Sequence, residues 1–334
     1  MSPSTRPILQ VSGLRVTYQT EDGPVYAAKD VSFTLGRGEI LALVGESGCG
    51  KTATAMAIPR LLDEARTTIG GSVLLDGVEL TGLSEKRMQQ VRGKDISVVF
   101  QEPMTSLNPA FTVGWQIGEV VRRHTSLTRR QVRERVVELL DLVGVPDARR
   151  RAGSYPHELS GGLRQRVMIA TAVACDPKVL IADEPTTALD VTIQAGVLDV
   201  IRDLREQLGT AVILITHDLG VVAEIADRVV VMYSGRHVEH SPTAAVFDSP
   251  QHPYTIGLLE ALPARAALRG GRRRLTEIPG LVPSPASDPD ACQFAPRCAR
   301  VTSACTAARP DLDAAAGGTD HLVACYHPGP GRES

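Results

Sequence analysis

A glycine-rich loop directly after an apolar segment constrains this 334-residue chain more than any other feature. Residues 45–52 read Gly-Glu-Ser-Gly-Cys-Gly-Lys-Thr and match G-x-x-x-x-G-K-[ST] at every fixed position. The preceding segment, Ile40–Val44, is apolar throughout, as a buried parallel strand should be. Glycines let a backbone wrap a phosphate with its N–H groups pointing inward, and a following helix adds partial positive charge. The sequence therefore predicts a strand, a phosphate-binding loop and a helix in succession.

The loop residues each have a predicted part in binding a nucleoside triphosphate. Lys51 is expected to reach the β- and γ-phosphates, and Thr52 to offer its hydroxyl to Mg²⁺. The full predicted contact set is Gly45, Glu46, Ser47, Gly48, Cys49, Gly50, Lys51 and Thr52. A chance glycine-rich turn is the alternative, and the flanking strand and helix signals disfavour it.

A second apolar segment ends in two carboxylates. Val179–Ala182 reads as a buried strand, and Asp183 and Glu184 follow it. Asp183 is predicted to hold Mg²⁺, directly or through water, and Glu184 to orient and deprotonate the attacking water. A helix-capping pair is the alternative, because Pro185 and Thr186 come next.

Strand-like and helix-like segments alternate along most of the chain, which predicts an α/β domain with a parallel sheet. The expected strands are Ile8–Val11, Arg15–Tyr18, Ala27–Leu35, Ile40–Val44, Gly71–Leu80, Ile96–Phe100, Val179–Ala182 and Val212–Thr216. A helical block at about 102–165 looks inserted; within it, Gln131–Val143 places its apolar residues on one helix face. The amino-acid composition of the chain changes near residue 260, so we expect one domain at 1–260 and a second at 261–334.

The segment Leu159-Ser-Gly-Gly-Leu-Arg-Gln-Arg166 resembles the signature motif of ATP-binding-cassette (ABC) ATPases. Other elements of that family's pattern occur in the right order over about residues 8–255. They are Tyr18, Gln101, Ala188-Leu189-Asp190 and His217. Each of these has an ordinary structural reading alone, but their joint order outweighs it. The family form has Gln where this chain has Leu163, which bears on the catalytic rate.

The resemblance implies a fold and a mechanism. The fold is a P-loop cassette with a helical subdomain and an antiparallel β subdomain. Tyr18 would stack on adenine, Gln101 would sense metal and water, and His217 would act as the switch histidine. Ser160, Gly161, Gly162 and Asp190 would contact ATP across a head-to-tail pair of cassettes. Since the chain carries one loop and one signature, a second subunit, expected to be a different chain, must supply the other half.

Finer matches are similar to ATPases of dipeptide and oligopeptide importers. They are Gln101–Pro109, Tyr155–Leu159, Ser249–Thr255 with Leu258-Leu259, and Ile278–Pro283. This resemblance implies two membrane permease subunits, with Pro103–Asn108 near their docking helix, and an extracellular solute-binding protein. Importers of nickel, sugars or other small solutes share parts of the pattern and remain an alternative.

Four cysteines gather in the C-terminal part, which predicts a small Cys-rich domain. Cys292, Cys298, Cys305 and Cys325 suit zinc or a [4Fe–4S] cluster, but no C-x₂-C pair is present. Some peptide-importer ATPases hold an iron–sulfur cluster in this extension, so the resemblance favours [4Fe–4S]. Zinc and free or oxidised thiols remain open.

Composition limits the other functional classes. The net charge of −2 gives no basic field for nucleic acid, and no apolar run is long enough to cross a bilayer. We expect a cytoplasmic protein that meets the membrane through its partners. A cassette acting on DNA or ribosomes, and a non-hydrolysing ATP-gated scaffold, are the rival hypotheses. The intact Glu184 and His217 argue against the scaffold.

Overall fold

The computed structural model describes residues 6–102, 106–187, 191–262, 278–284, 286–315 and 319–329. These residues divide into two compact units that interleave along the chain. The first comprises Met1–Leu9, Thr34–Ile40 and Leu74–Ile215, and the second Gln10–Phe33, Leu41–Val73 and Thr216–Ser334.

Three parallel strands form the core of the first unit: β6 (Ile96–Val99), β7 (Val179–Asp183) and β8 (Ala211–Ile215). Every residue of β7 and β8 is buried, as expected for strands covered on both faces. The helix α8 (Val191–Leu208) connects them and buries Val197, Ile201 and Leu204. The three predicted strands are confirmed to within one residue at each end.

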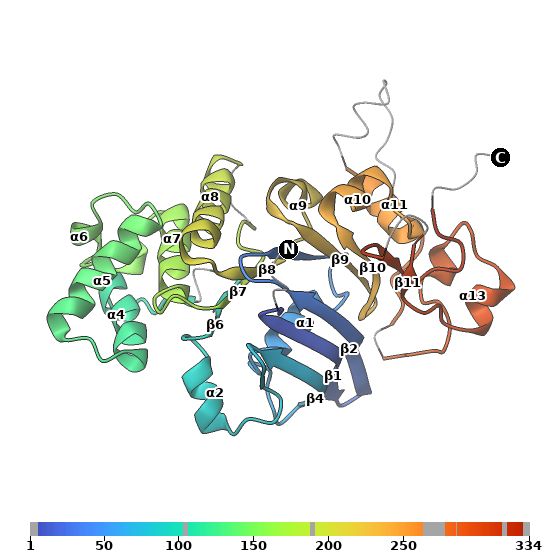
Figure 1. The fold of residues 1–334 in the computed structure, drawn as a ribbon, viewed down its shortest axis with the longest axis horizontal. Coiled ribbons are helices and arrows are strands. Elements are labelled where there is room, and N and C mark those ends of the chain that lie inside the picture. The colour runs from blue at the N-terminus through green and yellow to red at the C-terminus, as the bar shows by residue number, and fades with distance from the viewer. Residues whose placement is uncertain are drawn as a thin grey trace. The chain divides into compact units, whose positions relative to one another are not determined.

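The helical block of the first unit contains α4 (Val113–His124), α5 (Arg129–Leu142), α6 (Ala148–Arg151), η1 (Pro156–Glu158) and α7 (Gly161–Ala172). These helices lie together in Figure 1, in green and yellow-green. Thr128 begins α5 with a capping box to Gln131, and α5 buries its predicted apolar face, Val132, Val136, Leu139 and Leu140. The unit also contains β5 (Val78–Glu79) and α2 (Glu85–Val91).

One sheet of the second unit has the hydrogen-bonded order β2 (Gly23–Leu35), β1 (Leu9–Thr20), β4 (Thr67–Leu75). The prediction of two separate strands at Ile8–Val11 and Arg15–Tyr18 is wrong, because β1 runs through both. Gly13 adopts φ +58° inside β1, so the glycine bends the strand locally without ending it.

The second sheet of this unit begins with β3 (Ile40–Val44), which pairs in parallel with β9 (Arg228–Tyr233). The strand β10 (Arg236–Pro242) pairs antiparallel with β9. Four helices accompany this sheet: α1 (Lys51–Ala57), α9 (Leu219–Ile225), α10 (Thr243–Asp248) and α11 (Pro253–Glu260). The strands β9 and β10 are not among the predicted strands, although Val229-Val-Val-Met232 carries the apolar signal of a buried strand.

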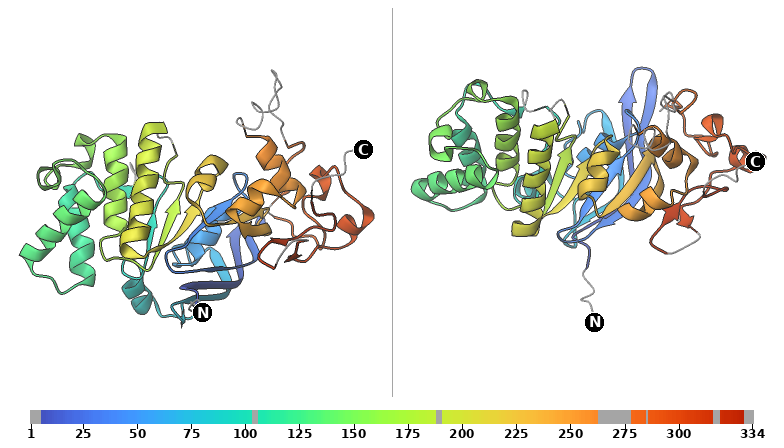
Figure 2. Two further views of the ribbon diagram at one scale, coloured as in Figure 1. Left: turned by 45° about the horizontal axis from the view of Figure 1, so that its top comes forward. Right: turned by 90° about the horizontal axis from the view of Figure 1, so that it is seen from above.

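The C-terminal extension continues this sheet. Its strand β12 (Leu322–Val323) pairs antiparallel with β10, and β11 (Asp313–Ala314) pairs with β12. It also contains η2 (Ala295–Arg297) and α13 (Ser303–Ala307), and both views of Figure 2 show this red segment beside the orange α10 and α11. Tyr233, Tyr254 and Phe294 pack with ring centroids 4.7–5.6 Å apart, so the extension shares the core of the unit.

Among the residues described above, no helix is both long and apolar enough to cross a membrane.

Candidate functional site

The phosphate loop follows β3 and leads into α1, as its pattern predicts. Gly45 and Gly50 have φ of +146° and +99°, in the region that favours glycine. A Cβ atom at Gly45 would collide with the carbonyl oxygen of Met232, and one at Gly50 with that of Ala27. Both glycines are therefore required by close backbone approach as well as by conformation.

Lys51 is buried beneath this loop. Its Nζ donates hydrogen bonds to the carbonyl oxygens of Gly45, at 2.7 Å, and Glu46, at 3.0 Å. Thr52 is exposed at the start of α1. Cys49 is 1% exposed, and burial raises the pKa of its thiol, so its predicted contact with ATP would come from its backbone.

Two side chains outside the predicted site hold Glu46. The Tyr254 hydroxyl accepts a hydrogen bond from the Glu46 N–H at 2.7 Å, and the Arg297 guanidinium pairs with the Glu46 carboxylate at 2.7 and 3.0 Å. Tyr254 lies in the importer-like segment Ser249–Thr255, so that resemblance was a signal for it. No local pattern marks Arg297, which lies 251 positions from Glu46.

The predicted catalytic carboxylates lie at the end of β7. Asp183 is 4% exposed, and Glu184 has φ +46° with its N–H bonded to the carbonyl of Ile215 at 2.9 Å. The Oε2 atom of Glu184 accepts hydrogen bonds from Gln101 Nε2 and Thr187 Oγ1, both at 2.9 Å. The fold thus brings Gln101 and Glu184 together from 83 positions apart, and holds the carboxylate where it could polarise a water.

The signature segment begins α7. Ser160 caps the helix, with its Oγ accepting from the N–H of Leu163 at 3.4 Å, and Gly161 is exposed next to it. Gly162 is buried against Ile193, where a Cβ atom would lie 2.7 Å from the Ile193 side chain. One turn later, Gln165 is 1% exposed and its Nε2 donates to the Pro185 carbonyl at 2.7 Å. The signature helix is therefore tied to the segment that follows Glu184.

Three further predicted residues lie elsewhere. Tyr18 is half-buried on β1, where burial raises the pKa of its hydroxyl. His217 is exposed just before Asp218, which caps α9. Asp190, with the rest of the predicted Ala188-Leu189-Asp190 loop, lies outside the described residues, as do positions 103–105. The phosphate loop, Tyr18 and His217 belong to the second unit, and the other described ATP-site residues to the first.

The four C-terminal cysteines line one narrow pocket of the second unit: Cys292, Cys298, Cys305 and Cys325. Backbone N–H groups of Arg300 and His327 donate to the sulfurs of Cys298 and Cys325, each at 3.3 Å. Burial raises the pKa of Cys292, and that of Cys325 to about 11. In the described part of the chain no three His, Cys, Asp or Glu side chains are grouped as ligands of a metal ion. This finding does not support the predicted [4Fe–4S] cluster.

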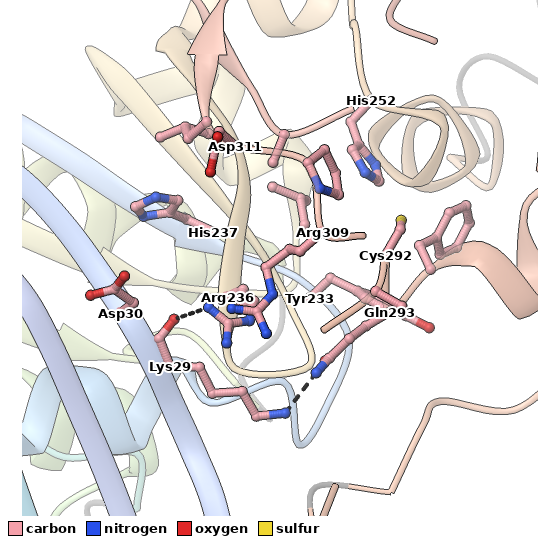
Figure 3. A pocket seen from close by; sticks show the side chains of 16 residues that line it. Lys29, Asp30, Tyr233, Arg236, His237, His252, Cys292, Gln293, Arg309 and Asp311 are labelled. Atoms are coloured by element: carbon pink, nitrogen blue, oxygen red, sulfur yellow. Dashed lines mark hydrogen bonds between the residues drawn. The ribbon is translucent and has the colours of Figure 1, made fainter. Parts of the chain in front are cut away.

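A second pocket, of about 170 Å³, lies where the extension meets β2, β9 and β10 (Figure 3). The Lys29 carbonyl accepts from Arg236 at 2.9 Å, and the Lys29 Nζ donates to the Ser287 carbonyl at 2.9 Å and to Gln293 at 3.4 Å. Arg236 also pairs with Asp288 at 2.8 Å. These polar contacts attach the extension to the strands.

Comparisons with known proteins agree with these features. Residues 28–187 match the ABC transporter family, and residues 238–305 match the oligopeptide/dipeptide transporter C-terminal region. The dimeric structure of the ABC transporter cassette MJ0796 is 27% identical, with a TM-score of 0.63 over 70% of this chain and 98% of that one. Another structure shows that cassette after hydrolysis, bound to ADP and Pi. The predicted α/β P-loop cassette is therefore confirmed, and the chain is of the ABC ATPase class.

Curated relatives narrow the class further. A Brucella ovis protein described as a peptide import ATP-binding protein is 53% identical over 92% of this chain and 94% of its own. A Brucella abortus protein of the same description is 50% identical over 95% of each. This chain belongs to the family of peptide-import ATP-binding subunits of ABC transporters.

Proposed function

We propose that the chain hydrolyses ATP to drive the import of peptides through a membrane complex. The observation that carries the hydrolytic role is the Glu184 carboxylate, held by Gln101 and Thr187 at the end of a buried strand. A carboxylate fixed in this way can orient a water for in-line attack on the γ-phosphate. The relatives described as peptide import proteins support the choice of peptide as cargo.

ATP is held, in this proposal, by the phosphate loop, with Lys51 on its β- and γ-phosphates and Tyr18 on its adenine. Thr52, Gln101 and Asp183 hold Mg²⁺, Glu184 is the base and His217 the switch residue. Ser160, Gly161, Gly162 and Asp190 complete the site of a second cassette. The exposure of Ser160 and Gly161 at the start of α7 supports this role, because a partner's nucleotide could reach them.

The remaining subunits follow from the same proposal. Two permeases span the membrane, a solute-binding protein delivers the cargo, and the chain lies peripherally at the cytoplasmic face. The nucleotide-binding domain spans 1–260 and includes the helical block at about 102–165, and the C-terminal extension spans 261–334. The second ATPase is a different, related chain.

The cysteine pocket is the candidate site of a [4Fe–4S] cluster. Its donor set fits: four thiols line one pocket, and N–H groups aimed at sulfur stabilise thiolate ligands. The cluster would supply a structural crosslink to the extension.

The cluster is tested on the full chain purified without oxygen. We expect about four iron and four sulfide per chain and a broad visible absorption band, both reduced by Cys298→Ser. Zinc at one equivalent, or metal-free thiols with full ATPase activity, would contradict the assignment.

The function is tested by peptide uptake in cells whose own copy is replaced. Glu184→Gln should abolish uptake and slow ATP hydrolysis at least about 100-fold while MgATP still binds, because only the base is lost. Glu206→Gln, which removes the same charge from an exposed position of α8, is the matched control. Competition by nickel or sugars, with none by peptides, would favour the alternative importer. Normal hydrolysis by Glu184→Gln would disprove the base assignment.

A further inference from the structure

The phosphate loop carries a carboxylate that is neutralised from the C-terminal extension. Arg297 places Nη1 2.7 Å from Oε2 of Glu46 and Nη2 3.0 Å from Oε1. The Arg297 side chain is 3% exposed and the Glu46 side chain 28% exposed. This is a two-point, largely buried ion pair, the form in which such pairs are strongest.

Contacts with residues other than Glu46 also hold the Arg297 guanidinium in place. Its Nε donates to the Pro279 carbonyl at 2.9 Å, and its Nη2 to the Ile278 carbonyl at 3.2 Å. Its Nη1 also lies 3.4 Å from the Tyr233 hydroxyl, and the Tyr233 ring lies 5.8 Å from the guanidinium carbon. The importer-like segment Ile278–Pro283 thus has a physical role, which is to supply carbonyl acceptors for Arg297.

A carboxylate at the second position of a phosphate loop works against the loop's ligand. ATP carries several negative charges, and like charges a few ångströms apart repel strongly near a protein surface, where water screens them incompletely. The pair with Arg297 cancels this charge. The Tyr254 hydroxyl separately fixes the Glu46 N–H at 2.7 Å, so the loop backbone keeps its shape.

We infer that Arg297 is a positioning residue for ATP binding, through which the affinity of the phosphate loop for MgATP depends on the C-terminal extension. Arg297 does not contact the nucleotide; it acts by neutralising and orienting Glu46. The inference rests on the proposed function, because it takes residues 45–52 as the ATP-binding loop.

The experiment measures MgATP binding to the full-length chain, and KM and kcat for ATP in the assembled transporter. Arg297→Gln should weaken MgATP binding about tenfold and raise KM by the same factor, with kcat changed less than about twofold. Because the loss is electrostatic, it should shrink as salt is raised from 0.05 to about 0.5 M. Arg309→Gln removes the same charge from a residue of the extension that pairs with Asp288 and Asp290, and should leave KM unchanged.

A second substitution separates charge from structure. Glu46→Gln combined with Arg297→Gln removes both charges, and should recover most of the affinity that Arg297→Gln loses. Arg297→Lys keeps the charge without the two-point geometry and should lie between wild type and Arg297→Gln. It also serves as the test if Arg297→Gln fails to fold.

Three results would overturn the inference. They are an unchanged KM in both Arg297 variants, no recovery in the double variant, and a loss equal at low and high salt. Lys51→Ala tests the underlying proposal separately: if it binds MgATP normally, residues 45–52 are not the ATP-binding loop, and the proposed function fails first. If Lys51→Ala loses binding and Arg297→Gln does not, only the inference about Arg297 fails.

Discussion

His240 makes the stability of this protein depend on pH in a way that can be calculated. It lies on β10, is 6% exposed, and its Nε2 is 2.6 Å from a terminal nitrogen of Arg228. Burial, and then the positive charge of Arg228, lower the pKa of His240 from 6.5 to about 3; His237 and His321 add to the effect. The folded protein therefore keeps this imidazole neutral, as an acceptor for Arg228.

The sign and size of the effect follow from the two pKa values. Above pH 6.5 His240 is neutral in both states and contributes no pH dependence. As the pH falls below 6.5, the unfolded chain takes up a proton that the folded chain refuses, and each pH unit costs about 1.4 kcal/mol. Between pH 7.5 and 5.0 the free energy of unfolding should therefore fall by about 2 kcal/mol through His240 alone.

The assay compares wild type with His240→Gln, which keeps an acceptor for Arg228 but cannot be protonated. Urea unfolding is followed by far-UV circular dichroism at pH 7.5 and 5.0. Both proteins share the losses from other buried histidines, such as His252, whose pKa burial lowers to about 4, so the difference isolates His240. The variant should lose about 2 kcal/mol less than wild type. Equal losses in the two proteins would refute the reasoning.

Three other substitutions have defined outcomes. Burial lowers the pKa of Lys29 to about 8, so wild type should gain stability between pH 8 and 10 as the folded chain sheds this proton early; urea midpoints of Lys29→Met should lack that gain. Gln165→Leu leaves the buried Pro185 carbonyl without its donor and should cost about 1–2 kcal/mol of unfolding free energy, with slower ATP hydrolysis. Gly162→Ala should cost about 1–3 kcal/mol by collision with Ile193, seen as a lower melting temperature.

Segments whose environment is uniform along their length could be predicted from the sequence. The strands β3, β7 and β8 are buried on both faces, so their residues are apolar without interruption and their ends are marked by loops or carboxylates. The phosphate loop could also be predicted from the sequence, because the local backbone conformation requires its glycines. The family resemblance gave Gln101 a role at the ATP site, but its pairing with Glu184 was not predicted.

Features that depend on contacts between residues far apart in the sequence could not be predicted in the same way. The sequence predicts two strands, Ile8–Val11 and Arg15–Tyr18, whereas pairing with neighbouring strands keeps β1 continuous through Gly13. Nothing near Arg297 indicates a partner 251 positions away. Two-residue strands such as β12 have no periodicity at all, and exist because β10 offers them an edge.

The anchoring of the extension shows why its contact with the phosphate loop can be effective. Glu239 on β10 is fully buried and accepts hydrogen bonds from the N–H groups of Gln251 and His252, each at 2.8 Å, and from His321 at 2.7 Å. Burial alone would raise the pKa of this carboxyl, but its hydrogen bonds hold the pKa below the ordinary value. A charge so fully bonded is costly to unpair, so β10, α11 and β12 resist separation.

Arg297 lies in the same extension, one residue before Cys298 of the cysteine pocket. A disturbance of the extension that displaced this guanidinium would leave Glu46 without its partner. Because an unpaired Glu46 repels ATP, whereas a neutral residue in its place would not, this carboxylate makes nucleotide binding conditional on a correctly folded extension. The Glu46 carboxylate would weaken ATP binding by the phosphate loop if it were unpaired. Its pairing with Arg297 therefore couples ATP binding to the C-terminal extension.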